Sequence, residues 1–214
     1  MFGLEISKEL RLYIIFGLFI GFLIGMNVLG GKIIPVGPFS TSVAFLIVPL
    51  SFLITDMVEE VYGKKKAREF IISGVITLAV FLGIILLFVA LPPHSRFSLN
   101  EEYRAIFGTS ARIVFASITA FLLSQFHDVW SFNFWKIKTQ GKLLWFRVNA
   151  STMLSQTIDT FVFMYLAFYM LTPAFTALFV LQITIPYLIF KLLWGVSNSP
   201  LVYLGASWLK RGSK

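Results

Sequence analysis

The sequence predicts an all-α membrane protein with six transmembrane helices and a short C-terminal interfacial helix. Its 214 residues are 57% hydrophobic and only 13% charged, whereas a soluble domain carries about 25% charged residues. The mean hydropathy is +0.84, and apolar runs recur from one end of the chain to the other. We therefore expect a single integral membrane domain over residues 1–214, with most of its surface facing lipid.

The spans follow from the apolar runs and from the residues that interrupt them. A membrane-spanning helix needs about 20 mostly apolar residues. Proline and glycine mark the turns between the runs, and Pro173 divides a late run that is too long for one helix. The expected spans are Leu12–Leu29, Thr41–Met57, Phe70–Leu91, Thr109–Trp130 (or onward to Trp135), Asn149–Leu171 and Ala174–Trp194, and the interfacial helix is Pro200–Leu209.

The distribution of Lys and Arg predicts the orientation in the membrane. If both termini are cytoplasmic, about 13 of the 18 basic residues fall on the inner side, as the positive-inside rule requires. This arrangement works only with an even number of spans. We therefore expect a multi-pass protein of the cell membrane with both termini in the cytoplasm, and we attribute the net charge of +8 to orientation in lipid rather than to nucleic-acid binding.

Several function classes are not expected. The chain has no cysteine, which excludes thiol nucleophiles and cysteine metal sites. It also lacks a phosphate-binding loop, a zinc-protease motif and a serine nucleophile elbow. We therefore expect neither an enzyme nor a bound metal or cofactor.

Three carboxylates lie at or just after the end of the second predicted span. Asp56, Glu59 and Glu60 lie on one helical face because they are three or four residues apart. Asp56 lies deepest in the apolar run, and charges there are costly unless they serve a function. We expect Asp56 and Glu60 to line a gate or site, and Glu59 to face the basic loop that follows; a solvated helix end is the alternative.

A motif of serine, glutamine, aspartate and phenylalanine occurs twice with identical spacing. Each copy places these side chains along one helical stripe, and the two copies lie on consecutive, oppositely directed spans. Inverted half-sites around one cavity are typical of secondary transporters, whereas the alternative is simple hydrogen bonding between helices. The copies are Ser124-Gln125-x-x-Asp128-x-x-x-Phe132 and Ser155-Gln156-x-x-Asp159-x-x-x-Phe163.

Other polar and small residues extend these patterns. Asn149 continues the polar stripe of the fifth span, and Lys191 lies within the last apolar run, where it either joins the site or reaches toward the membrane interface. The first span carries Gly17, Gly21 and Gly25, a spacing that allows close helix contact within the chain, in a homodimer or with another subunit.

Together, these motifs resemble the queuosine precursor transporter family, also called the vitamin uptake transporter family. The resemblance implies six spans and uptake of a 7-deazaguanine such as 7-cyano-7-deazaguanine. The matching segments are Asn27, Lys32, Pro49–Asp56, Glu60–Arg68, Ala116-Ser117, Ser124–Asp128, Asn149–Thr152, Ser155–Thr160 and Tyr187–Lys191.

The residue chemistry agrees with such a substrate. A guanine-like edge offers N–H donors to a carboxylate and a carbonyl to an amide, and its flat ring stacks on aromatic side chains. A self-sufficient carrier and a substrate-binding subunit that needs a separate energising module both remain open. The candidate substrate-binding residues are Asn27, Asp56, Glu60, Ser124, Gln125, Asp128, Phe132, Asn149, Gln156, Asp159, Phe163 and Lys191.

Overall fold

The computed structural model describes residues 7–140 and 144–210, with only the backbone described at 129, 132, 136, 144–149, 195, 196 and 199. Within these ranges the chain is mostly α-helical, as the sequence predicts. The elements are α1 (Lys8–Leu29), β1 (Ile33–Val36), β2 (Phe39–Ser42), the 3-10 helix η1 (Val43–Leu46), α2 (Val48–Ala90), α3 (Asn100–Lys138), α4 (Leu144–Phe168), α5 (Ala177–Ser197) and α6 (Ser199–Lys210).

Among the described residues, four helical segments are long and apolar enough to cross a membrane: Lys8–Leu29, Val43–Ala90, Asn100–Trp135 and Ala177–Trp194. The second of these covers most of two predicted spans, Thr41–Met57 and Phe70–Leu91. It is divided at Gly63, whose φ of 81° and ψ of 169° interrupt the helical geometry of α2. Glycine adopts a positive φ at no steric cost, so Gly63 separates α2 into two arms.

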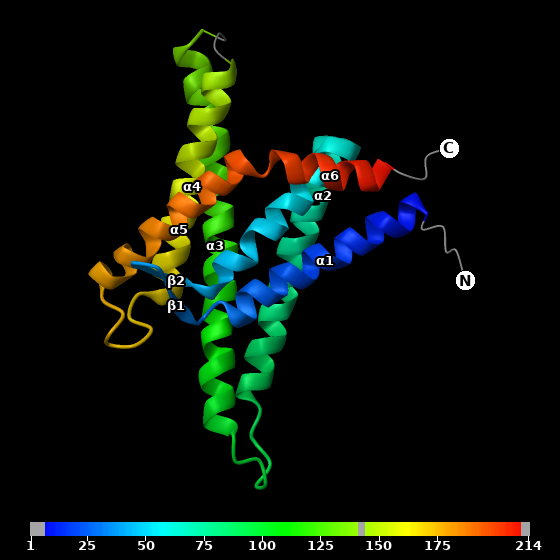
Figure 1. The fold of residues 1–214 in the computed structure, drawn as a ribbon. Coiled ribbons are helices and arrows are strands. Elements are labelled where there is room, and N and C mark those ends of the chain that lie inside the picture. The colour runs from blue at the N-terminus through cyan, green and yellow to red at the C-terminus, as the bar shows by residue number, and fades with distance from the viewer. Residues whose placement is uncertain (1–6, 141–143, 211–214) are drawn as a thin grey trace.

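The longest pairing in the fold joins α3 and α4, which run in opposite directions on either side of the turn after Lys138. At roughly 1.5 Å per residue, the 39 residues of α3 extend about 58 Å. This exceeds the hydrocarbon core of a bilayer, which is about 30 Å thick. One end of the α3–α4 pair accordingly projects beyond the other helices (Figure 1).

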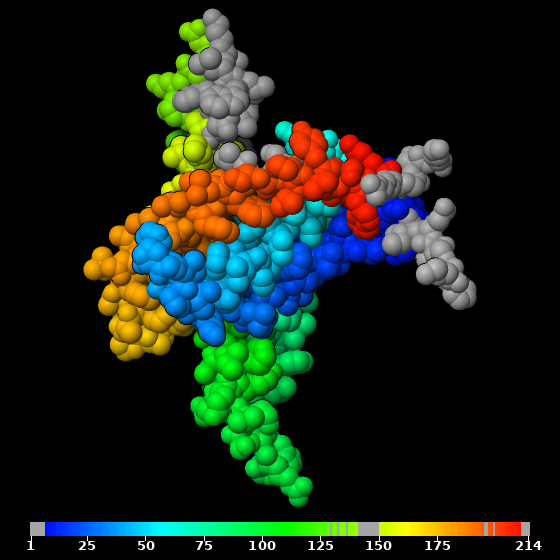
Figure 2. Space-filling view, viewed as in Figure 1, coloured from blue at the N-terminus to red at the C-terminus, as the bar shows by residue number. Residues whose placement is uncertain are grey.

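The connection between α1 and α2 differs from the prediction. Thr41, expected to begin the second span, instead lies in β2, and the hairpin β1–β2 pairs Ile33 with Ser42. The chain then turns through η1 before α2 begins at Val48. Strand β2 packs against α5, and Figure 2 shows α5 and α6 covering one face beside the hairpin and the start of α2.

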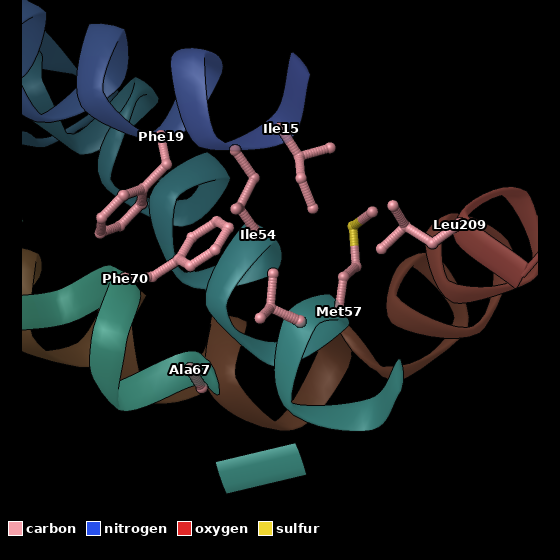
Figure 3. Packing of buried hydrophobic residues seen from close by; sticks show 8 residues of the cluster. Ile15, Phe19, Ile54, Met57, Ala67, Phe70 and Leu209 are labelled. Atoms are coloured by element: carbon pink, nitrogen blue, oxygen red, sulfur yellow. The ribbon is translucent and has the colours of Figure 1, made fainter. Parts of the chain in front are cut away.

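The short helix α6 completes the apolar core on the side of the Gly63 break. It packs mainly on α2 and contacts α1. Leu209 is fully buried with Met57, Ile15 and Phe70 in one cluster, which Figure 3 shows at the junction of the three helices. With 12 residues, α6 is about 18 Å long, which is too short to span a bilayer.

Candidate functional site

A central cavity of about 290 Å³ lies between the long helices. Helices α1 to α5 all contribute side chains to its lining. This volume is near the lower end of the range of roughly 300–1,000 Å³ that is usual for small-molecule sites. The cavity therefore suits a ligand of the size of one or two fused rings.

The lining divides into an apolar and a polar wall. Helix α1 and the second arm of α2 supply mostly aliphatic and aromatic side chains, such as Phe19 and Leu78. Helices α3, α4 and α5 supply most of the polar groups: Ser117, Ser124, Gln125, Gln156, Asp159, Thr160, Tyr187 and Lys191. A few polar groups against apolar walls is the usual composition of a pocket that orients its ligand.

An ion pair lies in the polar wall. Lys191 Nζ on α5 is 2.6 Å from Asp159 Oδ2 on α4. The Lys191 side chain is only 8% exposed and that of Asp159 is 26% exposed. Lys191 Nζ also lies 5.4 Å from the centre of the Phe52 ring, close enough for a cation–π contact. Lys191 is therefore held from two sides, while part of the Asp159 carboxylate stays accessible from the cavity.

Two side-chain amides present buried acceptors without a partner. Among the described residues, neither Gln156 Oε1 nor Asn27 Oδ1 accepts a hydrogen bond, and both residues line the cavity. Asn27 is oriented by its own helix, since its Nδ2 donates to the Leu23 carbonyl at 2.7 Å. A buried acceptor without a donor costs about 1–3 kcal/mol, so these two oxygens favour a ligand that brings N–H groups.

Hydroxyl groups around the cavity add further acceptors. Ser51, Thr55 and Thr160 each donate at 2.8 Å to a carbonyl of their own helix. A hydroxyl that donates its single hydrogen in this way retains lone pairs that can accept. The cavity is thus richer in acceptors than in donors, with Lys191 as a charged donor.

Seven of the twelve candidate residues line this cavity, although the sequence placed them on four separate spans. Asp56, Glu60 and Asp128 do not line it, and the side chains of Phe132 and Asn149 lie outside the described residues. The seven are Asn27, Ser124, Gln125, Gln156, Asp159, Phe163 and Lys191. Their role in binding stays a prediction.

The two copies of the repeated motif meet, but not symmetrically. Ser155 Oγ donates to Asp128 Oδ1 at 3.1 Å and so joins α4 to α3. Ser124 instead donates to the Phe121 carbonyl of its own helix. Asp128 is therefore engaged in a contact between helices outside the cavity lining, whereas Asp159 lies in the lining.

The two carboxylates at the end of the first arm of α2 contact the C-terminal part of the chain. Asn198 Nδ2 donates to Asp56 Oδ2 at 2.7 Å, and Lys210 Nζ lies 3.7 Å from Glu60 Oε1. These contacts draw the two side chains toward the junction of α5 and α6 and toward the end of α6 rather than into the cavity. The predicted role of Asp56 and Glu60 in a gate stays untested.

Aromatic lining residues were missed by sequence reasoning. Phe19, Phe52 and Phe121 line the cavity beside the predicted Phe163. In a chain with 24 phenylalanines, the residue type alone carries little information. The signal for Phe52 was its position between Ser51 and Thr55, which places all three near one helical face.

Comparison with known proteins identifies the family of this chain. Residues 42–205 match the family described as "Putative vitamin uptake transporter". The chain belongs to this family. The matched region includes every lining residue except those of α1, so nearly the whole cavity lies within the part that defines the vitamin uptake transporter family.

Three curated relatives carry a more specific name. The chain is 33% identical over 124 residues to a "Probable queuosine precursor transporter" of Bacillus subtilis, an alignment that covers 58% of this chain and 54% of the relative. A protein of the same name from Haemophilus influenzae is 30% identical over 71% of this chain and 62% of the relative. The "Queuosine precursor transporter" of Escherichia coli is 28% identical over 68% of this chain and 63% of the relative.

These alignments span less than two thirds of each relative's length. No solved structure matches the chain. The family and a multi-pass, apolar helical membrane protein are thus shown, and the substrate of this chain is a matter for proposal.

Proposed function

We propose that this chain is a membrane transporter that takes up a queuosine precursor base, 7-cyano-7-deazaguanine or a related 7-deazaguanine, through the central cavity. The observation that carries the proposal is the set of acceptors in the lining. Gln156 Oε1 and Asn27 Oδ1 lack partners among the described residues, and Asp159 has one oxygen beyond the one paired with Lys191.

A 7-deazaguanine meets these acceptors with N–H donors. The free base carries a ring N–H and an exocyclic amine on one edge and a second ring N–H on its five-membered ring. Each N–H that reaches an unpaired amide oxygen removes a desolvation cost of about 1–3 kcal/mol. The base also needs donors for its carbonyl, and Lys191 and the amide nitrogens of the glutamines can provide them.

Flat rings find aromatic surfaces in the same cavity. Phe52, Phe121 and Phe163 come from three different helices and all line it. Stacked and edge-to-face aromatic contacts contribute about 0.5–1.5 kcal/mol beyond the burial of apolar area. Apolar walls with a polar edge thus favour a planar heterocycle over a flexible or highly charged solute.

The proposed topology has six spans: α1, the two arms of α2, α3, α4 and α5. Contacts near the helix ends support it. Lys8 Nζ lies 5.4 Å from the centre of the Tyr62 ring, and Arg11 donates to the Trp208 carbonyl at 2.5 Å. The start of α1, the Gly63 break and the end of α6 therefore lie together, which favours an even number of spans with both termini on the cytoplasmic side.

Uptake by purified protein in liposomes tests the proposal. Labelled 7-cyano-7-deazaguanine should enter liposomes that contain the wild-type protein faster than empty liposomes, and excess unlabelled 7-deazaguanine should compete. Uptake no faster than in empty liposomes, together with no binding of any 7-deazaguanine in isothermal titration, would contradict the proposed substrate.

A second candidate is a substrate-binding subunit that works with a separate energising module. The observation that favours it is the outer surface of α1. A carbon atom added at Gly17, Gly21 or Gly25 would meet no other atom within 4 Å, so these glycines are not used for packing within the described chain. Binding of the base without uptake by the protein alone would favour this candidate, in which the energising module contacts the three glycines. A homodimer through the same face is the other possibility. Size-exclusion chromatography with light scattering distinguishes a homodimer from a single chain.

A further inference from the structure

We propose that Lys191 and Asp159 together form one recognition edge, which selects bases with the hydrogen-bonding pattern of guanine. This inference rests on the proposed function, because it specifies which edge of the base the cavity recognises. A guanine-type base presents in a row a carbonyl acceptor, a ring N–H donor and an amine donor. The complementary edge must offer a donor followed by two acceptors.

The ion pair has this order. Lys191 Nζ is a donor, and Asp159 Oδ2 lies 2.6 Å from it. The second carboxylate oxygen, Oδ1, follows at the fixed spacing of a carboxylate. The three atoms are therefore spaced much like neighbouring groups on the edge of a pyrimidine, and a planar base can bridge them without separating the two charges.

The surroundings keep this edge in place. Lys191 is 8% exposed and its Nζ lies 5.4 Å from the centre of the Phe52 ring, so its ammonium group has little freedom. Asp159 is the more exposed partner, at 26%, which leaves it accessible to a ligand. Gln156 lies one helical turn before Asp159 on α4, and its unpaired Oε1 can accept the second hydrogen of the amine.

The arrangement discriminates by repulsion as well as attraction. An adenine-type base would place its amine against the Lys191 ammonium and a ring acceptor against the Asp159 carboxylate, so that donor meets donor and acceptor meets acceptor. A hypoxanthine-type base keeps the first two bonds but leaves the second oxygen and Gln156 unpaired. Sites built to bond a polar group reject analogues that lack it, because their own groups then stay unsatisfied.

Asp159→Asn provides a sharp test, because it changes the pattern without removing the side chain. The asparagine can keep its oxygen beside Lys191 and present its nitrogen at the second position. The edge then complements a xanthine-type base, which has a carbonyl on each side of the ring N–H. A role of Asp159 in folding alone would weaken all bases equally and would not reverse a preference.

The experiment is isothermal titration of purified protein with 7-deazaguanine, 7-deazahypoxanthine, 7-deazaadenine and 7-deazaxanthine. We expect wild-type protein to bind 7-deazaguanine at least about tenfold more tightly than each other base, and Asp159→Asn to prefer 7-deazaxanthine over 7-deazaguanine. Glu69→Gln is the matched control, since it removes an exposed carboxylate from the Lys66–Glu69 ion pair and should leave the wild-type order unchanged.

The titration results separate failure of the recognition edge from failure of the proposed function. If wild-type protein binds 7-deazaguanine and 7-deazaadenine equally, the recognition edge is wrong although the transported class can still be right. The same holds if Asp159→Asn binds 7-deazaguanine as tightly as the wild type. If none of the bases binds, the proposed function and this inference both fail. The wild-type order needs no variant, so it tests the inference even if Asp159→Asn does not fold.

Discussion

Replacing Gln156 by leucine should leave the ligand-free protein at least as stable and weaken its binding of 7-deazaguanine. Gln156 Oε1 is buried without a hydrogen-bond partner among the described residues, and such an acceptor costs about 1–3 kcal/mol. Leucine fills a similar volume without the polar group. We therefore expect the free energy of unfolding of the ligand-free protein to stay level or rise by about 1 kcal/mol.

Binding should change in the opposite direction. Loss of one acceptor for a base N–H should weaken binding by about 1–3 kcal/mol, which corresponds to roughly a 5- to 150-fold higher Kd. Thermal unfolding in detergent and isothermal titration with 7-deazaguanine measure the two effects. Gln182→Leu is the control for binding, because Gln182 on α5 is exposed and does not line the cavity. A Gln156→Leu protein that is clearly less stable, yet binds as tightly as wild type, would refute the reasoning.

Three further changes test other parts of the structure. This chain has no cysteine, so single cysteines can report the topology. Ser98→Cys should react with an impermeant thiol reagent added outside cells, and Gln140→Cys should not. Labelling of Gln140→Cys from outside would refute the topology. Asp56→Ala should lower the free energy of unfolding by about 1.5–3 kcal/mol, since the buried Asn198 amide between α5 and α6 loses a charged acceptor. Glu59 is exposed, so Glu59→Gln should unfold like wild type, and equal effects of the two changes would count against the Asp56–Asn198 contact. Because Asp159 is held by a neighbouring ammonium group, we expect uptake into liposomes to reach equilibrium without proton coupling. Accumulation above equilibrium that is driven by an inward proton gradient would show the opposite.

The sequence located the helices well because their signals are local. Apolar runs and prolines such as Pro173 determine where helices can form and end, and every predicted span overlaps a helix, the second and third sharing α2. The boundaries were less predictable. Thr41 was assigned to a span because it adjoins apolar residues, but pairing with β1 places it in a strand. The strand also packs against α5, which is distant in sequence.

The cavity was predictable only in part, for a similar reason. Asp159 and Gln156 stand out because a charge or amide in an apolar run is costly. Lys191 stands out for the same reason, but its pairing with Asp159 does not, because the contact joins residues 32 positions apart. Phe121 carries no distinguishing signal in a chain rich in phenylalanine, and Phe52 is marked only by its position near Ser51 and Thr55. Sequence reasoning therefore found polar groups that line the cavity but not the geometry that combines them.

The two copies of the repeated motif have the same spacing in the sequence but make different contacts, because Lys191 on α5 pairs with the aspartate of only one copy. Ser155 on α4 bonds Asp128 on α3, and one turn further along both antiparallel helices Ser124 comes opposite Asp159. A symmetric pair would form a second serine–aspartate bond there. Lys191 on α5 pairs with the Asp159 carboxylate instead, because an ammonium group brings a full positive charge to the carboxylate, which a serine hydroxyl does not. Asp128 is thereby left to join two helices, and Asp159, held at one oxygen by the ammonium group, is the copy that the cavity can use.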